Sequence, residues 1–223
     1  MTRSSNRPLP GLLSTILLLL VSPLTSTDII DMDVECARGL QKGMKSYFHE
    51  SNGEAKCYVG YEAASEATGR NWTEAKAECE KLEATEFFKR GTLASIKIQD
   101  QPKHTINDII QTKMGLTCVA EWAKSYWTGA HVENLQDHDH DERNVDVIRT
   151  WYKWVADNTV VDARVWNEDQ PDNLHRPQFG GHQACGDFRC QYAPSDEAPF
   201  GLADFPCSRR KSFLCERQLS HID

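Results

Sequence analysis

The segment from residue 151 to residue 172 reads WYKWVADNTVVDARVWNEDQPD, and it carries most of the information about the fold. Trp151, Trp154 and Trp166 lie close together in it, with Asp157-Asn158 as a turn between them. Both helical patterns of the chain precede residue 116, whereas most of the predicted strands follow it. This order predicts the α+β class and not a βαβ fold. The predicted strands are 56–61, 126–131, 185–192 and 212–217.

Two helices are predicted upstream of that segment. In the first, Asn71 and Glu74 occupy the N-cap and N3 positions of a capping box. The second is predicted to begin after Asp100, with Pro102 in its first turn, and to end at Gly115. The apolar faces are Trp72, Ala75, Cys79 and Leu82 in the first helix, and Ile106, Ile109, Ile110 and Met114 in the second.

The first helix also contains Asn71-Trp72-Thr73, the only N-glycosylation sequon in the sequence. The side chain of Asn71 is also predicted to cap the helix, and sequons within tightly structured segments are often not glycosylated. Glycosylation of Asn71 and an unmodified helix cap therefore both remain open.

The first 27 residues differ in composition from the rest. Arg3 and Arg7 precede the apolar run 12–21, and small residues follow, which predicts a secretory signal peptide over 1–27. The run is too short for a membrane span, which needs about 20 apolar residues. Residues 28–56 are polar and weakly patterned, and we interpret them as an N-terminal extension. The mature protein is thus predicted to be secreted, extracellular and without a membrane span.

Charge and cysteine content narrow the classes of function. The chain has 223 residues and a net charge of −8, which argues against a nucleic-acid partner because phosphates require a basic face. Eight cysteines in an oxidising compartment predict disulfides, although their number alone does not choose the pairing. No serine or cysteine nucleophile is paired with a base at motif spacing, so the protein is predicted not to be an enzyme. Asp137–Glu142 alternates aspartate and histidine; a zinc site is conceivable there, but a solvated loop is favoured.

Seven short motifs, in order, resemble the C-type lectin-like domain between residues 57 and 217, leaving 218–223 as a tail. They are Trp72-x-x-Ala75-x-x-x-Cys79, Gly91–Ile96, Tyr126–Ala130, Trp154-x-x-Asp157-Asn158 with Trp166, Gln170-Pro171-Asp172, Leu202–Cys207 and Phe213–Glu216. The resemblance implies a disulfide-stabilised α+β fold with two helices, small antiparallel sheets and a long loop region. It also implies the disulfides Cys79–Cys215, Cys185–Cys207 and Cys36–Cys57. Cys118 and Cys190 are left over and are paired on parity alone.

By the same resemblance, a calcium ion in the long loop would bridge two sugar hydroxyls. The matching positions are Gln170, Asp172, Gln183 and Asp204, with Ala203 as a degraded ligand position, and a cis peptide bond is expected before Pro171. The order Gln-Pro-Asp resembles galactose-type sites, whereas Glu-Pro-Asn accompanies mannose. The 16 residues from Gln170 to Cys185 and the pair Gly180-Gly181 agree with galactose-type loops.

Three departures from the family pattern weaken this site. Gln183 stands where the family has glutamate, and Ala203 stands where it has asparagine, so a charge and a ligand are lost. Leu174 replaces a tryptophan that would stack on the sugar, a role that Phe179 or His175 could take. Calcium binding is therefore expected to be weak or absent. The alternatives are a secreted, galactose-type lectin for glycans and a lectin-like fold that binds an extracellular protein or a mineral without calcium.

Overall fold

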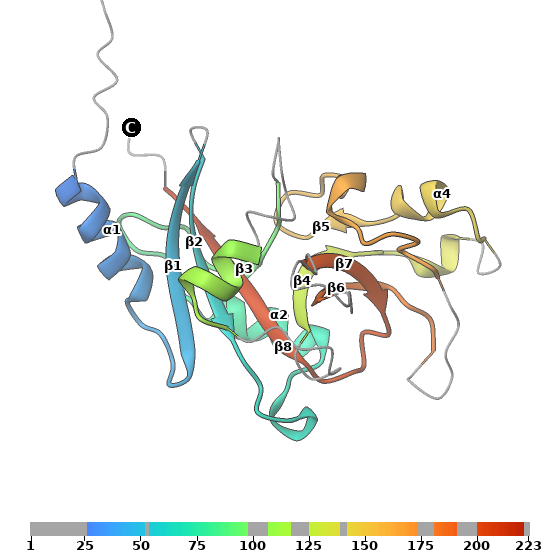
Figure 1. Ribbon diagram of the computed structural model, residues 1–223, viewed down its shortest axis with the longest axis horizontal. Coiled ribbons are helices and arrows are strands. Elements are labelled where there is room, and N and C mark those ends of the chain that lie inside the picture. Colours follow the sequence, from blue (N-terminus) through green and yellow to red (C-terminus); the bar gives the residue numbers. More distant parts are fainter. Residues whose placement is uncertain are drawn as a thin grey trace, which may run out of the picture.

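The computed structural model describes residues 26–51, 54–97, 107–116, 125–138, 142–173, 181–190 and 200–220. Within these residues, eight strands form one sheet with the central order β1-β2-β8-β4-β6-β7, while β3 pairs with β8 and β5 pairs with β4. Strand β8 thus lies in the middle of the sheet, between β2 and β4 (Figure 1). The strands are β1 (Met44–Ser51), β2 (Glu54–Tyr61), β3 (Thr92–Leu93), β4 (Tyr126–His131), β5 (Lys153–Trp154), β6 (Cys185–Cys190), β7 (Phe200–Phe205) and β8 (Ser212–Gln218).

The sheet corrects the expectation of small antiparallel sheets. Strands β4 and β8 pair in parallel, with Tyr126 opposite Ser212 and Trp127 opposite Phe213, and this pairing joins the two halves into one mixed sheet. The sequence pattern reveals where short strands lie, but it does not reveal which strands pair across long separations. The α+β character and the strand positions are confirmed, with 191–192 outside the described residues.

The N-terminal segment is more ordered than its polar sequence indicated. It forms the helix α1 (Ser26–Ala37) and the strand β1, which pairs along its whole length with β2. Met32, Cys36 and Phe48 are buried there, and Cys36 is bonded to Cys57 of β2. Strand β1 is an edge strand, and edge strands carry many polar residues, so its hydrophobic signal is weak. The prediction of two helices was therefore wrong, because α1 is an additional helix.

Both predicted helices are present, but only the first is a regular α-helix. The helix α2 (Trp72–Glu80) begins at the predicted capping box: Glu74 N donates to Asn71 Oδ1 over 2.8 Å, and Asn71 N donates to Glu74 Oε2 over 3.1 Å. The second helix is a short π-helix, η2 (Asp108–Lys113), and its predicted start lies outside the described residues. Ile109, Ile110 and Met114 are buried as predicted. Gly115 has φ +56°, which a glycine adopts readily at a helix end.

Three disulfides tie these elements together as the resemblance implied: Cys36–Cys57, Cys79–Cys215 and Cys185–Cys207. Cys118 lies outside the described residues, so its pairing with Cys190 stays a prediction. The sheet separates two hydrophobic clusters. One contains Tyr152, Trp154, Trp166, Phe188 and Leu202, and the other contains Trp72, Trp127, Phe205 and Phe213. In the described part of the chain, no helix has both the length and the apolar character needed to cross a membrane.

The cap at Asn71 gives a test that separates helix stability from glycosylation. Asn71→Ala removes both the cap and the sequon and should lower the free energy of unfolding by about 1 kcal/mol. Asn71→Asp also removes the sequon, but it keeps the oxygen that accepts from Glu74 N and should change stability by a few tenths of a kcal/mol. Denaturant unfolding of deglycosylated proteins measures both. Equal losses in the two variants would contradict the capping role.

Candidate functional site

The predicted loop site lies where Gln170–Asn173 meets β7. The Gln170–Pro171 bond is cis, as the resemblance implied, and Gln170 Nε2 lies 3.2 Å from Asp172 Oδ2. Asp204 of β7 anchors the loop with both carboxylate oxygens: Oδ1 accepts from Asp172 N over 2.9 Å, and Oδ2 accepts from Asn173 N over 2.8 Å. The structure therefore brings together Gln170, Asp172 and Asp204.

The other two predicted positions take different places. Gln183 is buried at 2% exposure, and its backbone carbonyl accepts a hydrogen bond from the Tyr152 hydroxyl over 2.9 Å. Ala203 is fully buried and pairs with Asp187 of β6, while Asp204 pairs with Gly186. Because successive side chains of a strand point to opposite faces, Ala203 lies on the face of Asp187, opposite that of the Asp204 carboxylate.

Two arginines that the sequence analysis did not single out hold the backbone of this site. Arg149 of the helix α4 (Val145–Arg149) donates from Nε to the carbonyl oxygen of Gln170 over 3.0 Å. Arg189 of β6 donates from Nη2 to the carbonyl oxygen of Asp204 over 2.9 Å. Neither arginine belongs to a recognisable motif, so nothing in the sequence marked them. Arg149 is also paired with Asp146 over 3.1 Å, and Arg189 with Asp187 over 3.0 Å.

Arg189 belongs to a buried ionic cluster beneath β7. Its Nε lies 3.0 Å from Asp187 Oδ1, and Lys211 Nζ contacts the other oxygen of Asp187 and lies 2.9 Å from Ser125 Oγ. Lys211 also lies over the ring of Phe205, with Nζ 3.9 Å from its centroid. Burial disfavours ionisation of Asp187, but the charges of Arg189 and Lys211 outweigh it and hold the pKa of Asp187 below its ordinary value.

The pKa of the Asp204 carboxylate is shifted in the opposite direction from that of Asp187. Burial and the nearby charge of Asp172 raise the pKa of Asp204 to about 7, although the two backbone N–H groups and Arg189 oppose this. Burial, with the charges of Asp204 and Asp172, raises the pKa of the Tyr152 hydroxyl well above its ordinary value. The site therefore carries fewer than two full negative charges at neutral pH.

The donor set does not fit a tightly held calcium ion. Calcium takes six to eight oxygen ligands, and its affinity follows the number of charged ligands. All three oxygens of Asp204 already accept hydrogen bonds, one of them from a cationic side chain. Ala203 offers no side-chain oxygen. Gln170 Oε1, by contrast, is buried and has no hydrogen-bond partner within the described part of the chain, and such an acceptor favours a ligand that donates to it.

One cluster of possible metal ligands in the described residues is already committed to a disulfide, and the alternating aspartate and histidine segment stays untested as a zinc site. One nitrogen of His131 and the sulfurs of Cys185 and Cys207 lie within 4.8 Å of one another, but both sulfurs are consumed by their disulfide. The alternating Asp137–Glu142 segment has residues 139–141 outside the described residues. His138 stacks on Trp151 with ring centroids 4.5 Å apart, which gives this histidine a packing role.

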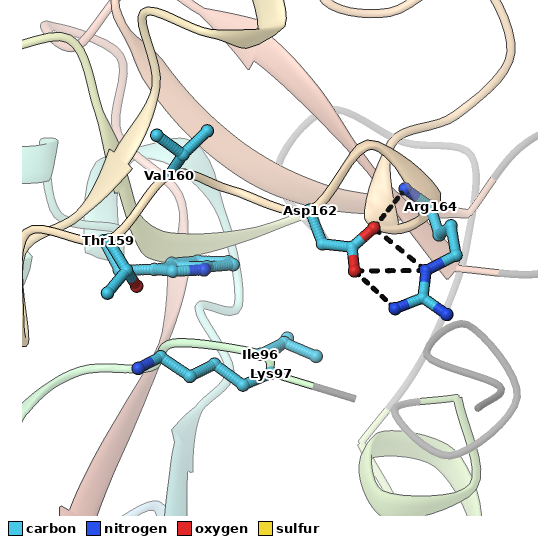
Figure 2. Close-up of a pocket in the computed structure, with 7 residues that line it drawn as sticks. Ile96, Lys97, Thr159, Val160, Asp162 and Arg164 are labelled. Atoms are coloured by element: carbon cyan, nitrogen blue, oxygen red, sulfur yellow. Dashed lines mark hydrogen bonds and ion pairs between the residues drawn. The ribbon is translucent and has the colours of Figure 1, made fainter. Parts of the chain in front are cut away.

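A pocket of about 280 Å³ lies next to β5 and holds none of the predicted site residues. Figure 2 shows Asp162 paired with Arg164 at one end, and Lys97 and Thr159 toward the other. Lys97 forms an ion pair with Asp157 outside the lining. Since these charges are already paired, the loop at Gln170 remains the better candidate for ligand binding.

No family model matches this chain, and no curated protein matches it either. Among solved structures, the crystal structure of CEL-IV, a C-type lectin, is similar, with a TM-score of 0.50 and 18% sequence identity. The similarity covers 79% of this chain and 94% of CEL-IV. At this identity the comparison concerns the fold alone. Together with the three disulfides and the mixed sheet, it supports a lectin-like fold for this chain.

Proposed function

We propose that the chain is a secreted, carbohydrate-binding module of the lectin-like type, and that its glycan site is the Gln170–Asp172 loop with Asp204. The observation that carries the proposal is the pairing of Gln170 and Asp172. An amide and a carboxylate lie 3.2 Å apart, and the amide oxygen accepts no hydrogen bond from the described residues. Two neighbouring sugar hydroxyls can each donate and accept, and they match such a pair.

The frame around this pair is consistent with a preformed binding site. Asp204 fixes the loop from β7 and Arg149 fixes it from α4, so that both sides of the cis turn are anchored. The three disulfides are typical of proteins that fold in an oxidising compartment, which agrees with secretion. The similar solved structure is a lectin and not an enzyme, which also favours binding over catalysis.

We further propose a galactose-type preference with calcium bound weakly or not at all. The exchange Gln170→Glu with Asp172→Asn leaves the formal charge unchanged but swaps the carboxylate and the amide, and therefore donor and acceptor. It should move relative binding from galactose-ended toward mannose-ended glycans. A glycan array, run with and without chelator, measures the shift.

Glu168→Gln is the matched control for this exchange, because Glu168 is an exposed neighbour of the loop. It should leave the glycan profile unchanged. Strong mannose binding by the unaltered protein would overturn the proposed preference. An unchanged glycan profile after the exchange at Gln170 and Asp172 would show that this pair is not the site.

A further inference from the structure

Arg189 lies beneath the glycan loop, on the face of β6 and β7 that also carries Asp187 and Ala203 and that is opposite the Asp204 carboxylate. Asp187 pairs with the small Ala203, and Arg189 pairs with Gly201, where the Asn167 side chain fills the space that a Cβ would take. The guanidinium crosses this face to reach the carbonyl oxygen of Asp204, 2.9 Å away. The loss of a side-chain oxygen at Ala203 thus coincides with space for a protein cation.

The guanidinium is held on three sides. Nε donates to Asp187 Oδ1 and Oδ2 over 3.0 and 3.3 Å, Nη2 donates to Asp204 O, and Cζ lies 4.8 Å from the centroid of the Phe205 ring. Asp187 is fully buried, and the Arg189 side chain is 30% exposed. A planar cation with this many fixed partners has a defined position.

Protein cations already offset much of the negative charge beside Asp204. Asp187 is paired with both Arg189 and Lys211, and Arg189 also reaches the backbone of Asp204. Arg149, which holds Gln170, is itself paired with Asp146 over 3.1 Å. A divalent cation binds where negative charge is in excess. Here Arg189 occupies the backbone oxygen of Asp204, and any ion close to that oxygen would meet a positive charge.

We propose that Arg189 is the resident cation of the glycan loop: it holds Asp204, and through Asp204 the Gln170–Asp172 turn, in place of a divalent metal ion. The consequence that glycans are bound without calcium rests on the proposed function. The exclusion of calcium by Arg189 is independent of the proposed function, because it depends only on the contacts between Arg189 and the residues around the loop.

The test is calcium titration of the full secreted protein by calorimetry, with Arg189→Gln and Arg189→Lys as a matched pair. Extracellular calcium modules have dissociation constants of roughly 0.1 to 1 mM, so a titration to about 10 mM is sufficient. The unaltered protein and Arg189→Lys, which keeps the charge, should show no binding. Arg189→Gln should bind calcium with a dissociation constant of about 1 mM or below, at least about tenfold tighter than the upper limit of the titration, because one positive charge leaves the site.

Thermal unfolding of the unaltered protein keeps the proposal testable if Arg189→Gln does not fold. Its midpoint should be the same in calcium and in chelator, since a ligand stabilises only a state that it binds. A midpoint that rises with calcium, or sub-millimolar calcium binding by the unaltered protein, overturns the role of Arg189. So does a folded Arg189→Gln variant with no gain in calcium affinity.

Retention on a galactose matrix separates this inference from the proposed function. Retention that persists in chelator supports both, and retention that chelator abolishes sinks the role of Arg189 but leaves a glycan-binding protein. If no glycan on the array or matrix is bound, while Arg189→Gln gains calcium affinity, the proposed function fails and the assignment of Arg189 stands.

Discussion

Replacement of both Cys79 and Cys215 by alanine is expected to lower the free energy of unfolding by about 5 kcal/mol. This disulfide joins α2 to β8 across a sequence separation of 136 residues. In the chain-entropy description, a cross-link stabilises the native state by restricting the unfolded chain, and the effect grows with the logarithm of the loop length. Denaturant unfolding of the oxidised proteins provides the measurement.

The matched control is the double replacement of Cys36 and Cys57, whose sequence separation is only 21. Its expected loss is about 3 kcal/mol from the same relation. Both pairs are fully buried, so the two variants lose comparable packing. A larger loss for the shorter loop would show that packing of α1 on the sheet, and not chain entropy, dominates these effects.

Lys211→Met should be strongly destabilising, with a loss of about 3 to 5 kcal/mol in the free energy of unfolding. Lys211 and Asp187 are 1% and 0% exposed, and Lys211 reaches the carboxylate directly. Its removal leaves Arg189 as the one cationic partner of Asp187 among the residues that the structure describes. A buried carboxylate that loses a partner retains its desolvation penalty.

The pH dependence of this loss has a defined sign. The pKa of Asp187 is lowered in the folded protein, so its contribution to stability is present above the ordinary value of 3.8 and is lost as the pH falls through the folded value. The difference between the unaltered protein and Lys211→Met should therefore shrink in acid. Lys76→Met, which breaks an exposed ion pair with Glu80, should cost less than about 1 kcal/mol at any pH. Equal losses for the two lysines would contradict the importance of burial.

Local signals in the sequence were sufficient for α2 and for its cap. Helical periodicity and capping depend on residues three or four positions apart, and both are visible in 71–82. The pairing of β4 with β8 depends on residues more than eighty positions apart, such as Trp127 and Phe213, and no local pattern encodes it. The strand β1 escaped notice for a different reason. It has a partner on one side only, so its polar residues do not oppose strand formation.

The candidate site likewise contains residues that the sequence predicted and residues that it did not. Gln170, Asp172 and Asp204 were predicted because they lie in motifs that resemble a known family, and the structure brings them together. The two arginines act on backbone carbonyl groups. Any residue has a carbonyl, so Gln170 and Asp204 give no sign in the sequence that they accept from Arg149 and Arg189. These cationic contacts to the loop could therefore be recognised only in three dimensions.

The central position of β8 has a consequence for biosynthesis. Strands β2, β3 and β4 all pair with β8, yet β8 is the last of the sheet's strands to leave the ribosome. Until it emerges, β2 and β4 lack the neighbour that joins them, and the nascent polypeptide exposes two unpaired strand edges. The sheet should therefore close only after β8 has been synthesised, and not while the earlier strands are being translated.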